Sequence, residues 1–137
     1  MTPFNQVELR KANKYSWQDL LSRGGFPDSY LSDSQEVSLR WRENYVQTFL
    51  QRDLRQFGIE QSPEKIRRLW IMLAHSHGQV INYSKLGQSL DQPHPTVNSY
   101  IDILTSTFMV RKLLPFEVNT KKRLVKSPKV YIRDSGI

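Results

Sequence analysis

The sequence predicts a mainly helical α+β protein, and three observations support this prediction. Between residues 62 and 107, apolar residues recur at helical spacing in three successive stretches separated by short turns. Two extended stretches then enclose a lysine-rich loop. Residues 1–60 form a helical lead-in with separate turn signals. This order of elements is typical of a winged helix-turn-helix, here with an N-terminal helical arm and a small β-hairpin wing.

The composition excludes several classes of protein. The chain has no cysteine, so disulfides, thiolate metal clusters and cysteine nucleophiles are excluded, and a cytoplasmic location is expected. The N-terminus lacks the basic and then apolar order of a signal peptide. The longest apolar run, residues 69–74, is far shorter than the roughly 20 residues that span a bilayer. Neither a membrane partner nor a cofactor is expected.

Nearly all of the excess positive charge lies near the C-terminus. The net charge is +7, yet residues 1–60 carry eight basic and eight acidic side chains. Residues 61–110 carry four against three, and residues 111–137 carry eight against two. Such a localised excess suits a polyanion, with nucleic acid as the first candidate. The alternative is a solvated basic hairpin that only keeps the protein soluble.

The helical arm is predicted over residues 1–60. A short helix follows the Ser16 cap, with Trp17, Leu20 and Leu21 on one side. The glycines and proline of residues 24–27 then predict a turn. Capping-box spacing at residues 33–36 starts a long helix that runs to residue 57.

The second domain is predicted over residues 61–137. Its first helix begins at Ser62, and a short extended piece follows at residues 80–81. Asn82 caps a second helix that runs to residue 90, residues 91–95 form a turn, and a third helix runs to about residue 107. Strands are expected at 108–114, 123–125 and 129–132. Gly78 is expected to end the first helix. The residues predicted to face inward from the three helices are Ile66, Leu69, Trp70, Leu73, His77, Leu86, Leu90, Val97, Tyr100, Ile101 and Leu104.

The wing and the third helix supply the candidate contacts to duplex DNA. Basic side chains neutralise phosphates, and the expected phosphate contacts are Lys121, Lys122, Arg123, Lys126 and Lys129. The polar side chains that could reach base edges are Thr96, Asn98 and Ser99. The third helix has no lysine or arginine, and Asp102 adds a negative charge. Weak, backbone-led binding is therefore expected rather than sequence-specific reading.

Two other classes of function are weighed against DNA binding. A protein-interaction module would dock on a partner, or on another copy, through the helix that carries Trp41, Tyr45 and Phe49. An enzyme is not expected, because His75, His77 and His94 have neither metal-ligand spacing nor a position for a base.

Specific strings also resemble a known family. They are residues 3–9 (PFNQVEL), 24–27 (GGFP), 45–53 (YVQTFLQRD), 68–75 (RLWIMLAH), 100–104 (YIDIL), 126–131 (KSPKVY) and 134–136 (DSG). Together they resemble the domain of unknown function that follows the ATPase module in many bacterial and archaeal AAA+-type ATPases. The resemblance covers essentially the whole chain in the family's order.

The resemblance implies an accessory domain without catalytic activity of its own. The chain would follow a missing ATPase module and end before a region similar to restriction endonucleases, so neither Walker nor nuclease motifs are present. The turn departs from the family where Asp91 and Pro93 replace glycine and a serine cap. Family members often carry basic residues at the positions of Asn98 and Ser99, which weakens base reading here.

Overall fold

The computed structural model describes residues 3–13, 15–56, 62–116 and 126–137. The chain forms two compact units, Met1–Glu60 with Asp134–Ile137, and Gln61–Arg133. Within the described residues the fold is mainly helical with a two-stranded antiparallel sheet, so the α+β class is confirmed at this level. None of the described helices is long and apolar enough to cross a membrane.

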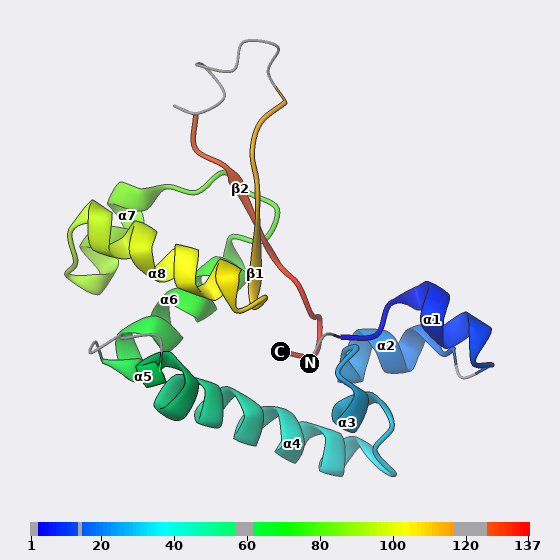
Figure 1. Cartoon of the computed structure of the whole chain (residues 1–137). Coiled ribbons are helices and arrows are strands. Elements are labelled where there is room, and N and C mark those ends of the chain that lie inside the picture. The colour runs from blue at the N-terminus through cyan, green and yellow to red at the C-terminus, as the bar shows by residue number, and fades with distance from the viewer. Residues whose placement is uncertain (1–2, 14, 57–61, 117–125) are drawn as a thin grey trace. The chain divides into compact units, whose positions relative to one another are not determined.

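The first unit consists of short helical segments around one longer helix (Figure 1). In chain order they are α1 Gln6–Lys11, α2 Trp17–Arg23, α3 Pro27–Tyr30, α4 Gln35–Thr48, the π-helical segment η1 Phe49–Asp53 and α5 Leu54–Gln56. The side chains of Asn5, Ser16 and Ser34 accept hydrogen bonds from backbone N–H groups in the first turns of α1, α2 and α4. The sequence predicts the starts of α2 and α4, but neither α1 nor α3.

The predicted helix α2 forms with its Ser16 cap, but little of its apolar side is buried. Trp17 is 58% exposed and Leu21 is 61% exposed, whereas Leu20 is half-buried. A helix of seven residues makes only about two turns, and α2 packs against α3 and α4 without burying any of its residues fully. So short a pattern does not determine which side of a helix is buried.

Helix α4 packs on the turn at residues 24–27 through aromatic rings. The ring centroid of Phe26 lies 5.8 Å from that of Trp41 and 4.9 Å from that of Tyr45. Trp41 and Tyr45 stack at 5.1 Å, and Phe49 is buried in η1. The aromatic stripe of this helix is therefore engaged inside its own unit.

A buried carboxylate joins the C-terminal residues to the first unit. Asp134 is 8% exposed; its Oδ2 accepts a hydrogen bond from the Gly25 N–H at 2.7 Å and its Oδ1 accepts one from the Gly136 N–H at 2.9 Å. Gly24 has a φ of +76°, and a Cβ there would lie 1.9 Å from Asp134 Oδ1. Only glycine fits so close to this carboxylate. The sequence analysis assigned residues 134–137 to the second domain, whereas their contacts place them in the first unit.

The second unit contains three helices and the sheet. They are α6 Pro63–His75, α7 Tyr83–Leu90, α8 His94–Ser106, β1 Val110–Leu113 and β2 Lys129–Ile132. The helices pack on one another, and the sheet packs on α6 through β2 and on α8 through β1 (Figure 1). All the apolar positions predicted to face inward from the three helices are buried. His77 is not, because α6 ends at His75 rather than at Gly78 and His77 is exposed.

Strand β2 has neighbours on both of its edges. It pairs antiparallel with β1 from Val110 opposite Ile132 to Leu113 opposite Lys129. On the other edge Val80 forms a bridge with Lys129, and three backbone hydrogen bonds of 2.7–3.1 Å link residues 78–81 to residues 128–130. The extended piece predicted at residues 80–81 is thus paired, while the one predicted at 123–125 lies outside the described residues.

Two predicted boundaries differ from the structure. Helix α8 begins at His94 with Pro95 in its first turn, although residues 91–95 were expected to be a turn. Proline is well tolerated there because the first N–H groups of a helix need no intrahelical acceptor. Strand β1 begins at Val110 because Phe108 has a φ of +64° and ends α8 instead of extending the strand.

Replacing Asp134 by alanine tests the buried carboxylate. Asp134→Ala removes both hydrogen bonds and leaves the Gly25 N–H without its acceptor, so we expect the free energy of unfolding to fall by about 2 kcal/mol. Urea unfolding followed by circular dichroism measures this change. Glu43→Ala, which removes an exposed acid from α4, is the control and should change stability by less than about 0.5 kcal/mol. Equal effects of the two variants would contradict the structural role of Asp134.

Removing the hydroxyl of Tyr100 should stabilise the second unit. Tyr100 is 1% exposed, and its hydroxyl has no hydrogen-bond partner among the described residues. Tyr100→Phe should raise the free energy of unfolding by about 1 kcal/mol. Burial raises the pKa of Tyr100 above the ordinary value of 10.0. Ionisation of Tyr100 therefore leaves the free energy of unfolding unchanged below pH 10 and lowers it as the pH rises from 10 through the raised pKa. Urea unfolding between pH 7 and about 11 should show a smaller alkaline loss in the variant; an unchanged alkaline loss would contradict this.

Candidate nucleic-acid interface

The residues predicted to contact DNA fall into three groups. Those outside the described residues are Lys121, Lys122 and Arg123. Those exposed at or just before the start of β2 are Lys126 and Lys129. Those in the first half of α8 are Thr96 and Asn98, which are half-buried, and Ser99, which is exposed.

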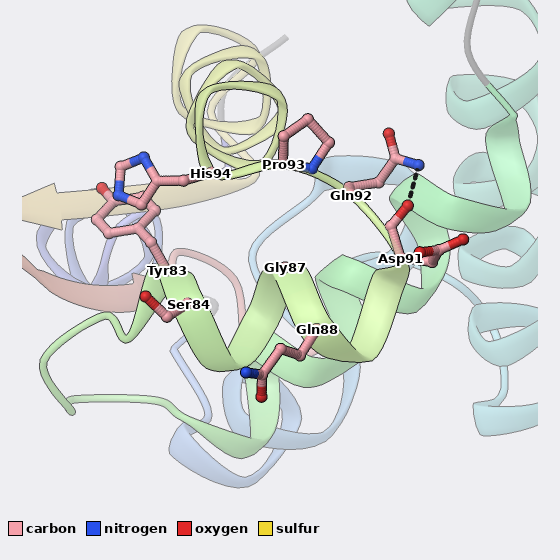
Figure 2. Close-up of a pocket in the computed structure, with 8 residues that line it drawn as sticks. All are labelled: Tyr83, Ser84, Gly87, Gln88, Asp91, Gln92, Pro93 and His94. Carbon is pink, nitrogen blue, oxygen red and sulfur yellow. Dashed lines mark hydrogen bonds between the residues drawn. The ribbon is translucent and has the colours of Figure 1, made fainter.

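A ring pair joins the beginnings of α7 and α8. Figure 2 shows Tyr83 and His94 side by side, and their ring centroids lie 4.6 Å apart. One hollow of about 450 Å³ extends from this pair along α7 to the turn at residues 91–93. A second hollow of about 430 Å³ extends from the same pair to Val80 and Ser127. The two hollows share Tyr83, Ser84 and His94, so one surface runs from the turn between the helices to the start of β2.

The N-terminus of α7 faces this surface. The Asn82 side chain accepts a hydrogen bond from the Lys85 N–H at 3.0 Å. The N–H groups of Tyr83 and Ser84 have no acceptor within the helix, because the first N–H groups of any helix lack one. The helix dipole places partial positive charge at this end, and the exposed Lys85 adds a full one. A bound anion would accept hydrogen bonds from these N–H groups and would neutralise this positive charge, so this end of α7 is suited to a phosphate.

The negative charge of Asp102 on α8 is neutralised within the second unit. Its carboxylate pairs with the Lys112 ammonium of β1 and accepts a hydrogen bond from Asn98 Nδ2 at 3.0 Å. Recognition of adenine by asparagine uses both atoms of its amide. Asp102 accepts one of the two Nδ2 hydrogens and so holds the amide in place, which leaves Asn98 its oxygen and a single N–H for a ligand.

Close backbone packing sets the position of α8 relative to α7. Gly87 lies in the middle of α7, and a Cβ there would lie 2.7 Å from the carbonyl oxygen of Gln92. The Gln92 N–H also donates a hydrogen bond of 3.0 Å to the Gly87 carbonyl. Asp91 between them adopts the left-handed conformation, with a φ of +51°. A glycine in α7 thus lets the turn lie directly against the helix.

The structure adds residues to this surface that the sequence analysis did not select. They are Tyr83, Ser84, Lys85, His94 and Ser127. The Asn82 cap already indicated a helix start near Tyr83, but the contact between Tyr83 and His94 depends on how two helices pack. Within the described part of the chain, histidine and carboxylate side chains form no group that could hold a metal ion.

Comparison with known proteins gives a family but no described activity. Uncharacterized protein Rv2008c of Mycobacterium tuberculosis and Uncharacterized protein Mb2031c of Mycobacterium bovis are each 46% identical to this chain over 131 residues. These residues are 96% of this chain and 30% of each relative, so the chain spans less than a third of their length. No solved structure matches the chain significantly. The profile of the domain of unknown function DUF8612 matches residues 14–137, and the chain therefore belongs to that family.

Proposed function

We propose that the second unit is a winged helix-turn-helix that binds duplex DNA weakly and without strong sequence preference. The order of its elements supports this proposal: α6, the paired residues 78–81, α7, α8, β1 and β2. So does the arrangement of the sheet, in which β2 lies between residues 78–81 and β1. In winged helices the helix in the position of α8 approaches the major groove, and the wing follows the backbone.

The observation that carries the proposal is the meeting of α7, α8 and the start of β2 around Tyr83 and His94. Two helix N-termini attract anions there. Exposed lysines occur in two of the segments that meet there, Lys85 in the first turn of α7 and Lys126 next to Ser127 before β2. Hydrogen bonds and charge at this surface are directed to phosphates, which supply affinity without reading sequence. The engagement of Asn98 by Asp102 accords with weak discrimination between bases.

We further propose that this domain is a non-catalytic accessory part of a cytoplasmic bacterial or archaeal protein with an AAA+-type ATPase module. The strings listed for the family resemblance support this setting, and the mycobacterial relatives are long enough to contain further domains. DNA binding by the second unit would then hold the ATPase on its substrate. No cofactor is needed for this role.

A second candidate function is docking on the ATPase module or on another copy of the chain. The observation that favours it is the number of exposed apolar side chains in the first unit: Trp17, Leu21, Leu31, Val37 and Leu39 are all at least half exposed. The residues first considered for docking are less available, because Trp41 and Tyr45 are half-buried and Phe49 is buried. A docking surface would therefore use the exposed side chains rather than the aromatic stripe of α4.

Charge removal at the two ends of the surface tests duplex binding. Fluorescence anisotropy of a labelled random-sequence duplex over a salt series gives the slope of log K against log [salt]. Lys85→Ala with Lys126→Ala should weaken binding and flatten this slope by up to about 1.8, because each lost phosphate contact removes about 0.9. The matched control is Arg67→Ala with Arg68→Ala, which removes two exposed charges from α6 and should leave the slope nearly unchanged. Absence of binding by the unaltered protein even at low salt would refute DNA binding and favour docking.

Substitutions on α8 test how the third helix is used. Asp102→Asn removes the negative charge and releases Lys112, so we expect tighter duplex binding and a slope steeper by about 0.9. Asn98→Ala should have a small effect on affinity, and the effect should be the same for every duplex sequence, since the Asn98 amide is held by Asp102. The measurement compares A·T-rich with G·C-rich duplexes. A loss confined to A·T-rich duplexes in Asn98→Ala would show that the side chain reads adenine and would contradict the proposed role.

A further inference from the structure

The two strands present a basic and aromatic face that meets the duplex-binding surface only at Lys129, the first residue of β2. Val110 and Val130 are buried toward the helices. Opposed residues in an antiparallel pair share a face, and faces alternate along each strand. The side chains on the outward face are therefore Arg111 with Tyr131, Leu113 with Lys129, and Arg133, which follows β2 and whose N–H donates a hydrogen bond to the Met109 carbonyl. The strands and Arg133 together place three cations and no carboxylate on this face.

An exposed aromatic side chain beside this face occupies a position that favours glycine. Phe108 follows α8 with a φ of +64°. The Met109 N–H donates to the Leu104 carbonyl at 2.9 Å, and the Phe108 N–H donates to the Thr105 carbonyl at 3.2 Å. These are the two hydrogen bonds of a Schellman motif, whose left-handed residue is usually glycine. A large side chain here costs stability and is still 51% exposed, so burial does not account for it.

The aromatic rings and the arginines of this face lie together. The Arg133 guanidinium lies over the Phe108 ring at 5.0 Å from its centroid. His77 meets the Tyr131 ring edge-on at 5.3 Å, and its Nδ1 accepts a hydrogen bond of 3.2 Å from the Ile132 N–H. A hollow of about 440 Å³ is lined by Arg111, Leu113, Tyr131, Ile132 and Arg133. The hollow is thus lined by the Tyr131 ring and by two guanidinium groups, that of Arg111 from β1 and that of Arg133 just after β2.

We propose that the outward face of β1 and β2 binds single-stranded nucleic acid. Unpaired bases stack on Tyr131 and Phe108, and Arg111 and Arg133 contact the phosphates that link those bases. Single strands are bound by this combination of aromatic platforms and cations, because only their bases are free to stack. The proposal goes beyond duplex binding, which is assigned to α7, α8 and the residues before β2.

The chemistry of the face favours a single strand over an acidic peptide. A peptide carboxylate would satisfy the arginines but would leave Phe108 exposed beside them. A base with its phosphate uses the ring and the guanidinium together, and arginine also stacks on aromatic planes. The strained position of Phe108 supports a role for its ring, because residues with strained backbones cluster at functional sites.

A pair of substitutions at Phe108 separates the ring from its effect on stability. Phe108→Gly and Phe108→Ala both remove the ring, but only glycine relieves the left-handed backbone, so the glycine variant should melt at a higher temperature than the alanine variant. Both should bind a labelled oligothymidylate of about 16 nucleotides at least about fivefold more weakly than the unaltered protein, as expected for one lost stacking platform. Tyr131→Leu should cause a similar loss.

The arginines are tested in the same anisotropy assay. Arg111→Gln with Arg133→Gln should flatten the salt slope for the oligothymidylate by about 1.4, because each phosphate contact to a single strand contributes about 0.7. Neither the arginine variant nor the variants at Phe108 and Tyr131 should alter the affinity for the duplex by more than about twofold. Conversely, Lys85→Ala should weaken the duplex and leave the single strand unchanged, so failure of one proposal is distinguishable from failure of the other.

Three outcomes would overturn the proposal. The first is the absence of oligothymidylate binding at low salt. The second is full affinity in both Phe108 variants, because the ring would then have no contact with the bases. The third is equally effective competition by a poly-glutamate peptide of matched charge, which would identify the face as a site for acidic peptides.

Discussion

The pairing of β2 on both of its edges is the constraint on which the second unit depends. On one edge β2 is bonded to residues 78–81, which connect α6 to α7. On the other it is bonded to β1, which follows α8. The two ends of the three-helix sequence are thereby tied to one strand, and Val130 of that strand is fully buried among them. The hollow between Val80, Tyr83 and Ser127 exists because this pairing brings their segments together.

Local energetic costs in this unit lie next to the surfaces that we consider functional. Phe108 adopts a conformation that glycine would adopt more easily. Lys85 stands at a helix end whose dipole is unfavourable to cations. The core positions of the same helices, in contrast, satisfy both helical spacing and burial. Conflicts between local preference and observed structure are expected where function selects the residue.

The two proposed surfaces divide the charge of the second unit between duplex and single-stranded ligands. Asp102 and Lys112 neutralise each other between α8 and β1, which leaves α8 nearly uncharged. Among the described residues, the cations at the two proposed surfaces stand at the beginning of α7, at the start of β2 and on the outward face of the sheet, while those of α6 lie on neither surface. A domain with both surfaces would hold a junction of paired and unpaired strands.

Helical spacing by itself determined the three helices of the second unit and their core residues, since a buried helix face imposes its period on the sequence. Capping residues indicated where several helices begin, and the distribution of charge showed that the C-terminal part is basic. Only the tertiary structure decided that Asp102 engages Asn98 and Lys112, that Tyr83 meets His94, and that Asp134 closes on Gly25. These contacts join residues from different elements or distant parts of the chain, and local periodicity carries no information about such distances. The α2 pattern predicted the helix and its cap but not the exposure of Trp17 and Leu21, because neighbouring elements select the buried face of so short a helix.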